Sequence, residues 1–116
     1  MSKHMVLLIT APSEEEAASL ANILVNERLC ACVNIIPGVR SIYRWEGKVC
    51  DEREVMMVAK TASSLAPVLV KRVKELHSYD VPEVICLPIT TGSGDYLDWI
   101  DDCVLMGGAG GSDTEI

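Results

Sequence analysis

The sequence predicts an α+β fold in which two helices cover one face of a four-stranded antiparallel sheet. Three observations indicate it: two long strand-like segments within residues 32–60, apolar runs of strand length at 5–10 and 84–89, and two segments with apolar residues at helical spacing. In chain order they read strand, helix, strand, strand, helix, strand, followed by a short terminal helix. This is the ferredoxin-like order. We expect one domain over residues 1–104, because a chain of 116 residues can bury one core.

The two long strands are predicted to form a hairpin that turns at Glu46-Gly47. A two-residue loop ending in Gly favours a tight turn, since Gly accepts the positive φ that such a turn needs. Pro37-Gly38 interrupts the first arm and predicts a bulge or bend, because Pro cannot donate to a sheet ladder.

The apolar pattern of this hairpin predicts an assembly of several copies. Residues 55–59 are apolar on both strand faces, whereas a half-solvated strand would alternate. Near the turn, Ile42, Tyr43, Trp45 and Val49 stand among charged neighbours, beyond the reach of one core. Apolar surface of this kind usually marks a contact with a partner. A strand buried on both sides within one subunit is the alternative.

The first helix is predicted to start after Ser13, with Glu16 completing a capping-box pattern, and to end near Arg28-Leu29. Its expected buried stripe is Ala17, Leu20, Ala21, Leu24 and Val25.

The second helix has cap candidates in residues 61–64 and Pro67 in its first turn, where Pro is tolerated. Its expected core face is Leu65, Leu69, Val73 and Leu76. A terminal helix is expected over residues 95–104, with one side formed by Tyr96, Trp99, Ile100 and Cys103. Residues 105–116 are Gly-rich and acidic and are expected to be flexible.

Composition restricts the partners. The formal net charge is −7, so nucleic acid and anionic membranes are unfavourable partners. No run approaches the roughly 20 apolar residues that span a bilayer, and no signal peptide is apparent. Five cysteines in no recognisable framework indicate reduced thiols and a cytoplasmic setting.

Cys30 and Cys32 are the first candidates for metal chemistry. They alternate in an expected extended segment, so both side chains should point the same way. A pair of soft thiols, with an imidazole nearby, suits copper. The alternative is that both pack as small hydrophobic residues, which is the expectation for Cys86 and Cys103.

The segment 77–83 holds the remaining polar candidates. His77 can cap the second helix, or act as a metal ligand or proton carrier. Glu83 can pair with Lys60 if their strands are neighbours, or act as a ligand. No Ser-His-Asp triad, carboxylate pair or activated nucleophile is recognisable, so we do not expect an enzyme.

Five motifs, taken together, resemble the CutA family of divalent-cation-tolerance proteins: TAPSEEEA, LCACVNIIPGVRSIYRWEGKV, VAKT, HSYDVPEVICLPIT and YLDWI. The resemblance covers nearly the whole chain from Met5 to Val104. It implies a ferredoxin-like subunit in a compact trimer similar to the PII signalling proteins, a link to copper and other divalent metals, and no established enzymatic reaction. It also implies a cleft between subunits lined by Lys60, His77, Tyr79 and Glu83.

Two functions remain open. The first is a trimeric protein that binds Cu(II) or a similar ion through Cys32, His77 and Glu83, without an organic cofactor. The second is a PII-like sensor or interaction scaffold that holds a small ligand or partner segment in the cleft. In both cases the expected trimer interface is Tyr43, Trp45, Met56, Val58 and Trp99.

Overall fold

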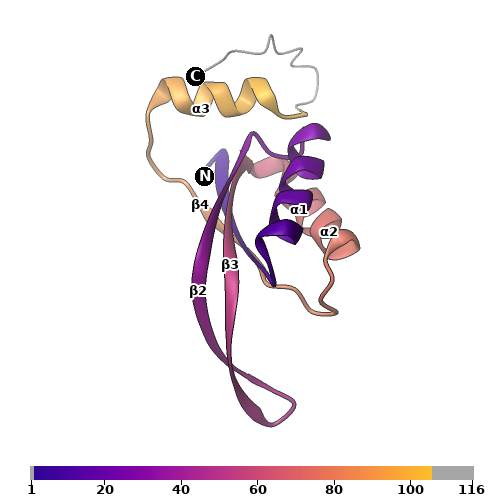
Figure 1. Cartoon of the computed structure of the whole chain (residues 1–116). Helices are drawn as coiled ribbons and strands as arrows, with labels where there is room; N and C mark the ends of the chain where they lie inside the picture. Colours follow the sequence, from indigo (N-terminus) through magenta and orange to yellow (C-terminus); the bar gives the residue numbers. More distant parts are fainter. Residues whose placement is uncertain (1, 106–116) are drawn as a thin grey trace.

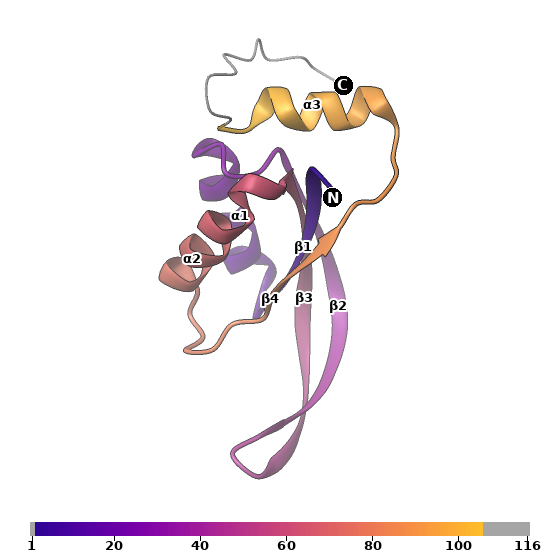
Figure 2. The same ribbon diagram turned by 180° about the vertical axis from the view of Figure 1, so that it is seen from behind.

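The computed structural model describes residues 2–105. Its elements, in chain order, are β1 (His4–Ala11), α1 (Glu14–Asn26), β2 (Cys32–Trp45), β3 (Lys48–Ala62), a 3-10 turn (Ser63–Leu65), α2 (Ala66–Leu76), β4 (Val84–Pro88) and α3 (Gly94–Cys103). Helices α1 and α2 lie on one side of the sheet, and α3 lies across the end farthest from the β2–β3 turn (Figures 1 and 2). The predicted α+β, ferredoxin-like order is confirmed.

The sheet has the strand order β2-β3-β1-β4, and every neighbouring pair is antiparallel. Strand β1 is therefore central, with β3 on one side and β4 on the other. Leu8 stands opposite Val58 of β3 and Ile85 of β4. Directly opposed residues point to the same face of a sheet, so the register assigns each side chain to a face.

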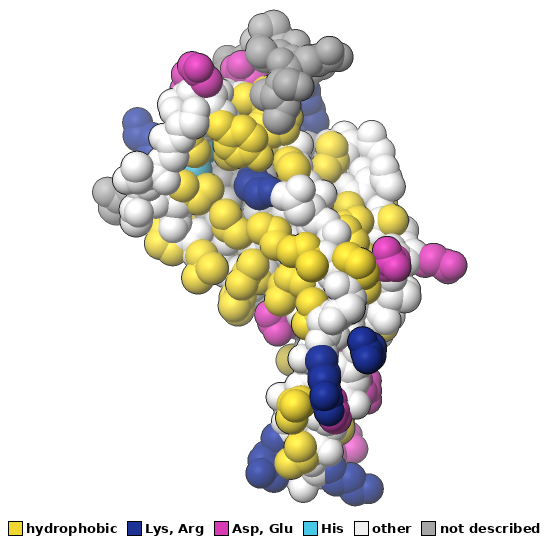
Figure 3. All heavy atoms as spheres, turned by 60° about the vertical axis from the view of Figure 1, so that its left-hand side comes forward, with side chains coloured by type: hydrophobic (Ala, Val, Ile, Leu, Met, Phe, Trp, Pro, Cys, Tyr) yellow, Lys and Arg dark blue, Asp and Glu magenta, His cyan; other side chains and the backbone are white. Residues whose placement is uncertain are grey.

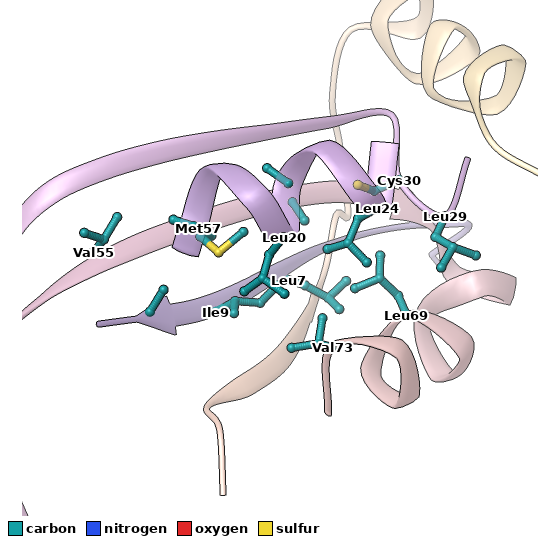
Figure 4. Close-up of a cluster of buried hydrophobic side chains, with 14 of the residues drawn as sticks. Leu7, Ile9, Leu20, Leu24, Leu29, Cys30, Val55, Met57, Leu69 and Val73 are labelled. Carbon is teal, nitrogen blue, oxygen red and sulfur yellow. The ribbon is translucent and has the colours of Figure 1, made fainter. Parts of the chain in front are cut away.

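The main core lies between the sheet and the two helices (Figure 4). Alternate residues of β1 and β3, among them Leu7, Ile9 and Met57, are fully buried there. Their burial supplies the main stabilisation, at about 25 cal/mol per Å² of apolar surface. The fully buried residues contributed by the helices are Ala17, Leu24, Leu69 and Val73.

The β2–β3 hairpin extends well beyond the helices (Figure 1). Glu46 and Gly47 have φ values of 49° and 78°, so both turn residues adopt the left-handed conformation of a primed turn. The ladder shifts register between Ile36 and Val39, and Gly38 between them has a φ of 78°. The predicted turn and bulge are both confirmed.

The face of the sheet opposite α1 and α2 carries a broad group of hydrophobic side chains (Figure 3). Met56 and Val58 point to this face, because they alternate with the core residues of β3. Ile36, Ile85 and Leu87, on the outer strands, are exposed. Strand β3 therefore carries apolar side chains on both faces, as predicted, but within one chain the helices cover only one of them.

The ends of α1 agree in part with prediction. The Glu16 N–H donates to Ser13 Oγ at 3.1 Å, which confirms the cap. The helix ends at Asn26, two residues before the predicted end. Val25 was expected in the buried stripe but is exposed, because it lies on the outer flank of α1, beside the edge strand β2.

Helix α2 begins without the predicted side-chain cap. Strand β3 continues to Ala62, and the hydroxyls expected to cap the helix make other bonds. Thr61 Oγ1 donates to the Leu29 carbonyl at 2.7 Å, and Ser63 Oγ donates to the Ser2 carbonyl at 2.9 Å. These bonds connect the end of β3 to segments distant in sequence.

Helix α3 packs on a second, smaller cluster at the end of the sheet, formed by buried Ala31, Ala62, Ile100 and Val104 with Leu65, Tyr96, Leu97, Trp99 and Cys103 around them. His4 of β1 and Asp101 of α3 are hydrogen-bonded, with 2.9 Å between Nε2 and Oδ1. Residues 105–116 were expected to be a flexible tail. Apart from Leu105, they lie outside the described residues.

The cysteines correct two predictions. Cys30 is buried in the main core, whereas Cys32 points to the uncovered face, where its Sγ contacts Lys60. The chain bends at Ala31 and becomes a strand only at Cys32, so the two thiols do not point the same way. Cys86 was expected in the core but is exposed, because β4 is an edge strand.

Candidate functional site

A groove of about 680 Å³ lies between the β2–β3 hairpin and the segment that connects α2 to β4. The hairpin contributes Tyr43, Trp45 and Glu54, and the connecting segment contributes Tyr79 and Glu83. The groove therefore depends on the length of the hairpin, because its wall is formed by the part that extends past the helices. Two of the residues expected in the ligand cleft, Tyr79 and Glu83, line it.

Tyr79 connects the two walls of the groove. Its hydroxyl donates a hydrogen bond to Glu54 Oε2 at 2.9 Å. Burial raises the pKa of the Tyr79 hydroxyl, and the bond to the Glu54 carboxylate raises it further. Burial also raises the pKa of Tyr43, with the Glu52 carboxylate as the next cause. Both phenols stay protonated at neutral pH and remain hydrogen-bond donors.

His77 lies behind the groove with a fully buried side chain. Its Nε2 is 2.7 Å from the Thr10 carbonyl and its Nδ1 accepts from the Tyr79 N–H at 3.0 Å, so the proton is on Nε2. Glu16 Oε2 is 3.5 Å from Nδ1 and accepts two hydrogen bonds from Ser78. Both ring nitrogens are therefore engaged in holding the 77–79 segment against β1. This arrangement suits a structural His better than a free ligand.

Lys60 and Cys32 lie elsewhere, near the end of the sheet that α3 covers. They are directly opposed on β3 and β2, and the Lys60 Nζ is 3.9 Å from Cys32 Sγ and hydrogen-bonded to Asn34. Burial raises the pKa of the Tyr96 hydroxyl of α3, and its interaction with the nearby Cys32 thiol raises it further. Cys32 is thus a half-buried thiol beside an ammonium group.

Within one chain, the predicted residues do not form one site. Strand β1 separates β3 from β4, so the predicted Lys60–Glu83 pair is not formed. Lys60 is opposite Val6, whereas His77 contacts Thr10, four residues further along β1. In residues 2–105 no group of three or more His, Cys, Asp and Glu side chains is arranged to hold a metal ion. The donors Cys32, His77 and Glu83 therefore do not fit a metal site within a single chain.

The predicted interface residues differ in exposure. Trp45 and Tyr43 are 49% and 38% exposed, while Met56 and Val58 are half-buried on the uncovered face. Trp99 is partly packed within the chain, with its ring centroid 5.4 Å from that of Tyr96.

Sequence reasoning missed Glu54 and Arg40 as groove residues. The Arg40 guanidinium forms a two-bond ion pair with Asp51, at 2.9 and 2.6 Å. The alternation of the β3 arm places a carboxylate at Glu54 but does not indicate that a tyrosine 25 residues later meets it. That contact depends on how the 77–83 segment returns to the sheet.

The chain matches the family model described as "CutA1 divalent ion tolerance protein" over residues 5–103. It belongs to the CutA1 family. The divalent-cation tolerance protein CutA of Thermus thermophilus is 54% identical over 95 residues, which cover 82% of this chain and 92% of that protein. Human protein CutA is 47% identical over 92 residues, covering 79% of this chain. The chain spans about half the length of its plant and mammalian relatives.

Solved CutA1 structures share the fold. The Thermus thermophilus protein superposes with a TM-score of 0.84 at 50% identity, covering 87% of this chain and 98% of that one. CutA1 from Oryza sativa superposes with a TM-score of 0.88 at 42% identity, covering 91% and 97%. The family is named for divalent-ion tolerance rather than for a catalysed reaction. None of the helices within residues 2–105 has the length and apolar character needed to cross a membrane.

Proposed function

We propose that this protein assembles as a homotrimer, binds divalent metal ions, Cu(II) among them, and takes part in the cytoplasmic response to such ions. The observation that carries the proposal is membership of a family named for divalent-ion tolerance. The uncovered apolar face supports the assembly, since a contiguous exposed patch of this kind marks a protein contact. Five free cysteines support a reducing compartment.

The ligands of such a metal site would come from more than one copy of the chain. Cys32 is the proposed anchor, because its thiol lies half-buried on the uncovered face and is a soft ligand suited to copper. His77 and Glu83, the other proposed ligands, lie away from Cys32 within a chain and would reach it only from a neighbour. His77 would also have to release the Tyr79 N–H from its Nδ1.

Calorimetric titration with Cu(II) tests this proposal. Removal of a metal ligand should lower the affinity about 10-fold or more, so Cys32→Ser should do this while Cys86→Ser, which removes an exposed thiol on β4, should not. The affinity should also fall as pH drops below about 6–7, because imidazole and thiolate bind metal only when deprotonated. Binding that disappears in moderate salt, or that is equal in both variants, would reject Cys32 as a ligand.

A second function is favoured by the groove. Its volume of about 680 Å³ lies within the usual range of roughly 300–1,000 Å³ for small-ligand sites, and its lining combines aromatic rings with a few polar groups. The protein would then act as a PII-like sensor or scaffold that holds a small ligand where copies meet. Tyr79 and Glu83 would contact the ligand, with His77 supporting Tyr79 and Lys60 contributed by another copy.

A further inference from the structure

The lining of the groove has a distinctive chemistry. Three aromatic side chains, Tyr43, Trp45 and Tyr79, occur together with the carboxylates of Glu54 and Glu83. The faces of aromatic rings attract cations, and carboxylates accept hydrogen bonds from ammonium groups. Aromatic rings combined with carboxylates are the usual lining of sites for organic cations.

The charges in the groove are not balanced. Asp80 is a third carboxylate in the lining, and Arg40 is the only Lys or Arg among its described residues. The Arg40 guanidinium is already paired with Asp51, with 2.9 and 2.6 Å between donor and acceptor atoms. Glu54 accepts one bond from the Tyr79 hydroxyl, which is neutral and leaves the carboxylate charge in place. An excess of negative charge therefore faces the groove.

These carboxylates are not arranged for a metal ion. In the described part of the chain, no three acidic, His or Cys side chains come close enough together to ligate one. Carboxylates that line a groove together with aromatic rings, without converging on one point, fit instead a ligand whose positive charges are separated by hydrocarbon. Each ammonium group can then meet its own carboxylate or ring.

We propose that this groove binds a linear organic polyamine. Its ammonium groups contact Glu54 and Glu83, and its methylene segments lie against Trp45, Tyr43 and Tyr79. The inference rests on the second proposed function, a small-ligand groove, and names its ligand class. The second proposed function places the ligand where copies meet, and Tyr43 and Trp45 are also expected at that contact. The experiment therefore uses the intact protein in solution.

Calorimetry with spermidine as the probe tests the proposal. We expect saturable binding with a fixed stoichiometry per chain. Glu54→Gln and Glu83→Gln should each weaken it about 10-fold, the typical effect of losing a charged hydrogen-bond partner. Gln at 54 can still accept the Tyr79 hydrogen bond, so the groove should keep its shape. Glu75→Gln removes an exposed carboxylate of α2 outside the groove and should leave the affinity unchanged.

Fluorescence locates the bound probe. The chain has two tryptophans, so Trp99→Phe leaves Trp45 as the only one. Spermidine should then change the Trp45 emission with the same midpoint as the calorimetric titration. A linear diol of similar length, which has the same hydrocarbon but no charge, should bind at least about 10-fold more weakly, since it makes neither the ammonium–carboxylate contacts nor the cation–π contacts.

The outcomes separate the ligand class from the function on which it rests. If the diol binds as well as spermidine and moves the Trp45 emission, the groove holds ligands but does not select cations, and the polyamine proposal is overturned while the small-ligand function stands. If neither compound binds the intact protein, both fail. If Glu75→Gln weakens binding as much as Glu54→Gln, spermidine is attracted by the net charge of −7 and not by the groove.

Discussion

At the scale of single residues, the position of each side chain relative to the sheet decides its chemistry. Cys30 and Cys32 differ by two positions, but one thiol is buried in the core and the other contacts an ammonium group. His77, predicted to cap a helix or to bind a metal, is the C-cap residue of α2, and both of its ring nitrogens are engaged with the backbone of Thr10 and Tyr79. Cys30 is therefore a core residue, while within a single chain the imidazole of His77 holds the 77–79 segment.

The burial of the Cys30 thiol can be tested through the pH dependence of stability. Burial raises the pKa of this thiol from 9.0 to about 12. Because the folded-state pKa is raised, the stabilisation is fully present well below pH 9 and is lost as pH rises towards 12, since the unfolded thiol ionises first. Between pH 9 and 10.5 the free energy of unfolding should fall by about 1.6 kcal/mol, because the slope increases from about half of its full value of roughly 1.4 kcal/mol per pH unit at pH 9.

Urea denaturation at these two pH values measures the loss. In Cys30→Ala the decline with pH should be clearly smaller, whatever the variant's stability at neutral pH. Iodoacetamide should alkylate Cys86 of the folded protein well before Cys30. Rapid modification of Cys30 in the native state would show that the thiol is accessible and not part of the core.

At the scale of elements, local sequence signals work where the backbone itself sets the requirement. Ser13 caps α1, Pro67 lies in the first turn of α2, and Gly47 occupies a left-handed turn position. Each signal acts through groups no more than a few residues away. Such features can be changed one at a time, and their cost can be measured.

The cap of α1 should contribute about 1 kcal/mol. Ser13→Ala removes the acceptor of the Glu16 N–H and should lower the free energy of unfolding by about that amount. Ser19→Ala is the matched control, because Ser19 is exposed in the same helix, where Ala has the higher helix propensity. Chemical denaturation of both variants should therefore give changes of opposite sign. Equal changes would mean that the hydroxyl of Ser13 does not act as a cap.

Two substitutions in the hairpin turn should change the stability of the protein in opposite directions. Gly47→Ala should destabilise the protein by about 1 kcal/mol or more, since φ is 78° there. A Cβ at Gly47 would meet no atom within 4 Å, so the cost is one of backbone conformation alone. Glu46→Asn should stabilise by roughly 0.5 kcal/mol, because Asn tolerates a left-handed φ. Melting temperatures at one protein concentration test both, and a neutral Gly47→Ala would indicate that the turn adopts another type.

At the scale of the whole molecule, a single chain leaves part of its apolar surface exposed to solvent. One sheet face is packed by α1 and α2, while the other face and the outer half of the hairpin expose hydrophobic residues (Figure 3). The chain measures 47 × 26 × 23 Å along its principal axes, an elongation that comes from the hairpin. Copies of the same chain are the proposed cover for this surface.

The proposed trimer leads to a prediction for Trp45. Light scattering coupled to size exclusion should give about three times the chain mass of 12.6 kDa at micromolar concentration. Truncating a buried Trp costs about 3–5 kcal/mol, so Trp45→Ala should lower the melting temperature and promote dissociation if another copy covers this half-exposed ring. Val68→Ala, on a similarly exposed apolar residue of α2, should leave the mass unchanged. A monomeric wild-type protein would refute the trimer.

The sequence by itself determined the order of elements, the Glu46-Gly47 turn, the bulge at Pro37-Gly38 and the apolar character of both β3 faces. These properties depend on the local periodicity of 2 or 3.6 residues and on the φ angles of Gly and Pro, all of which short segments contain. Family membership also follows from motifs along the chain. The end of α1 was misplaced because Arg28 adopts a left-handed φ of 60°, which lets the Leu29 N–H bond back to the Leu24 carbonyl, and Arg is not a residue that signals such a conformation.

Only the tertiary structure decided which polar residues meet. The insertion of β1 between β3 and β4 separates Lys60 from Glu83, and the return of the 77–83 segment brings Tyr79 to Glu54. The bend at Ala31 divides the two cysteines between the faces of the sheet. Such contacts depend on strand order and on loop paths, which are set by the packing of the whole core and not by the residues that meet.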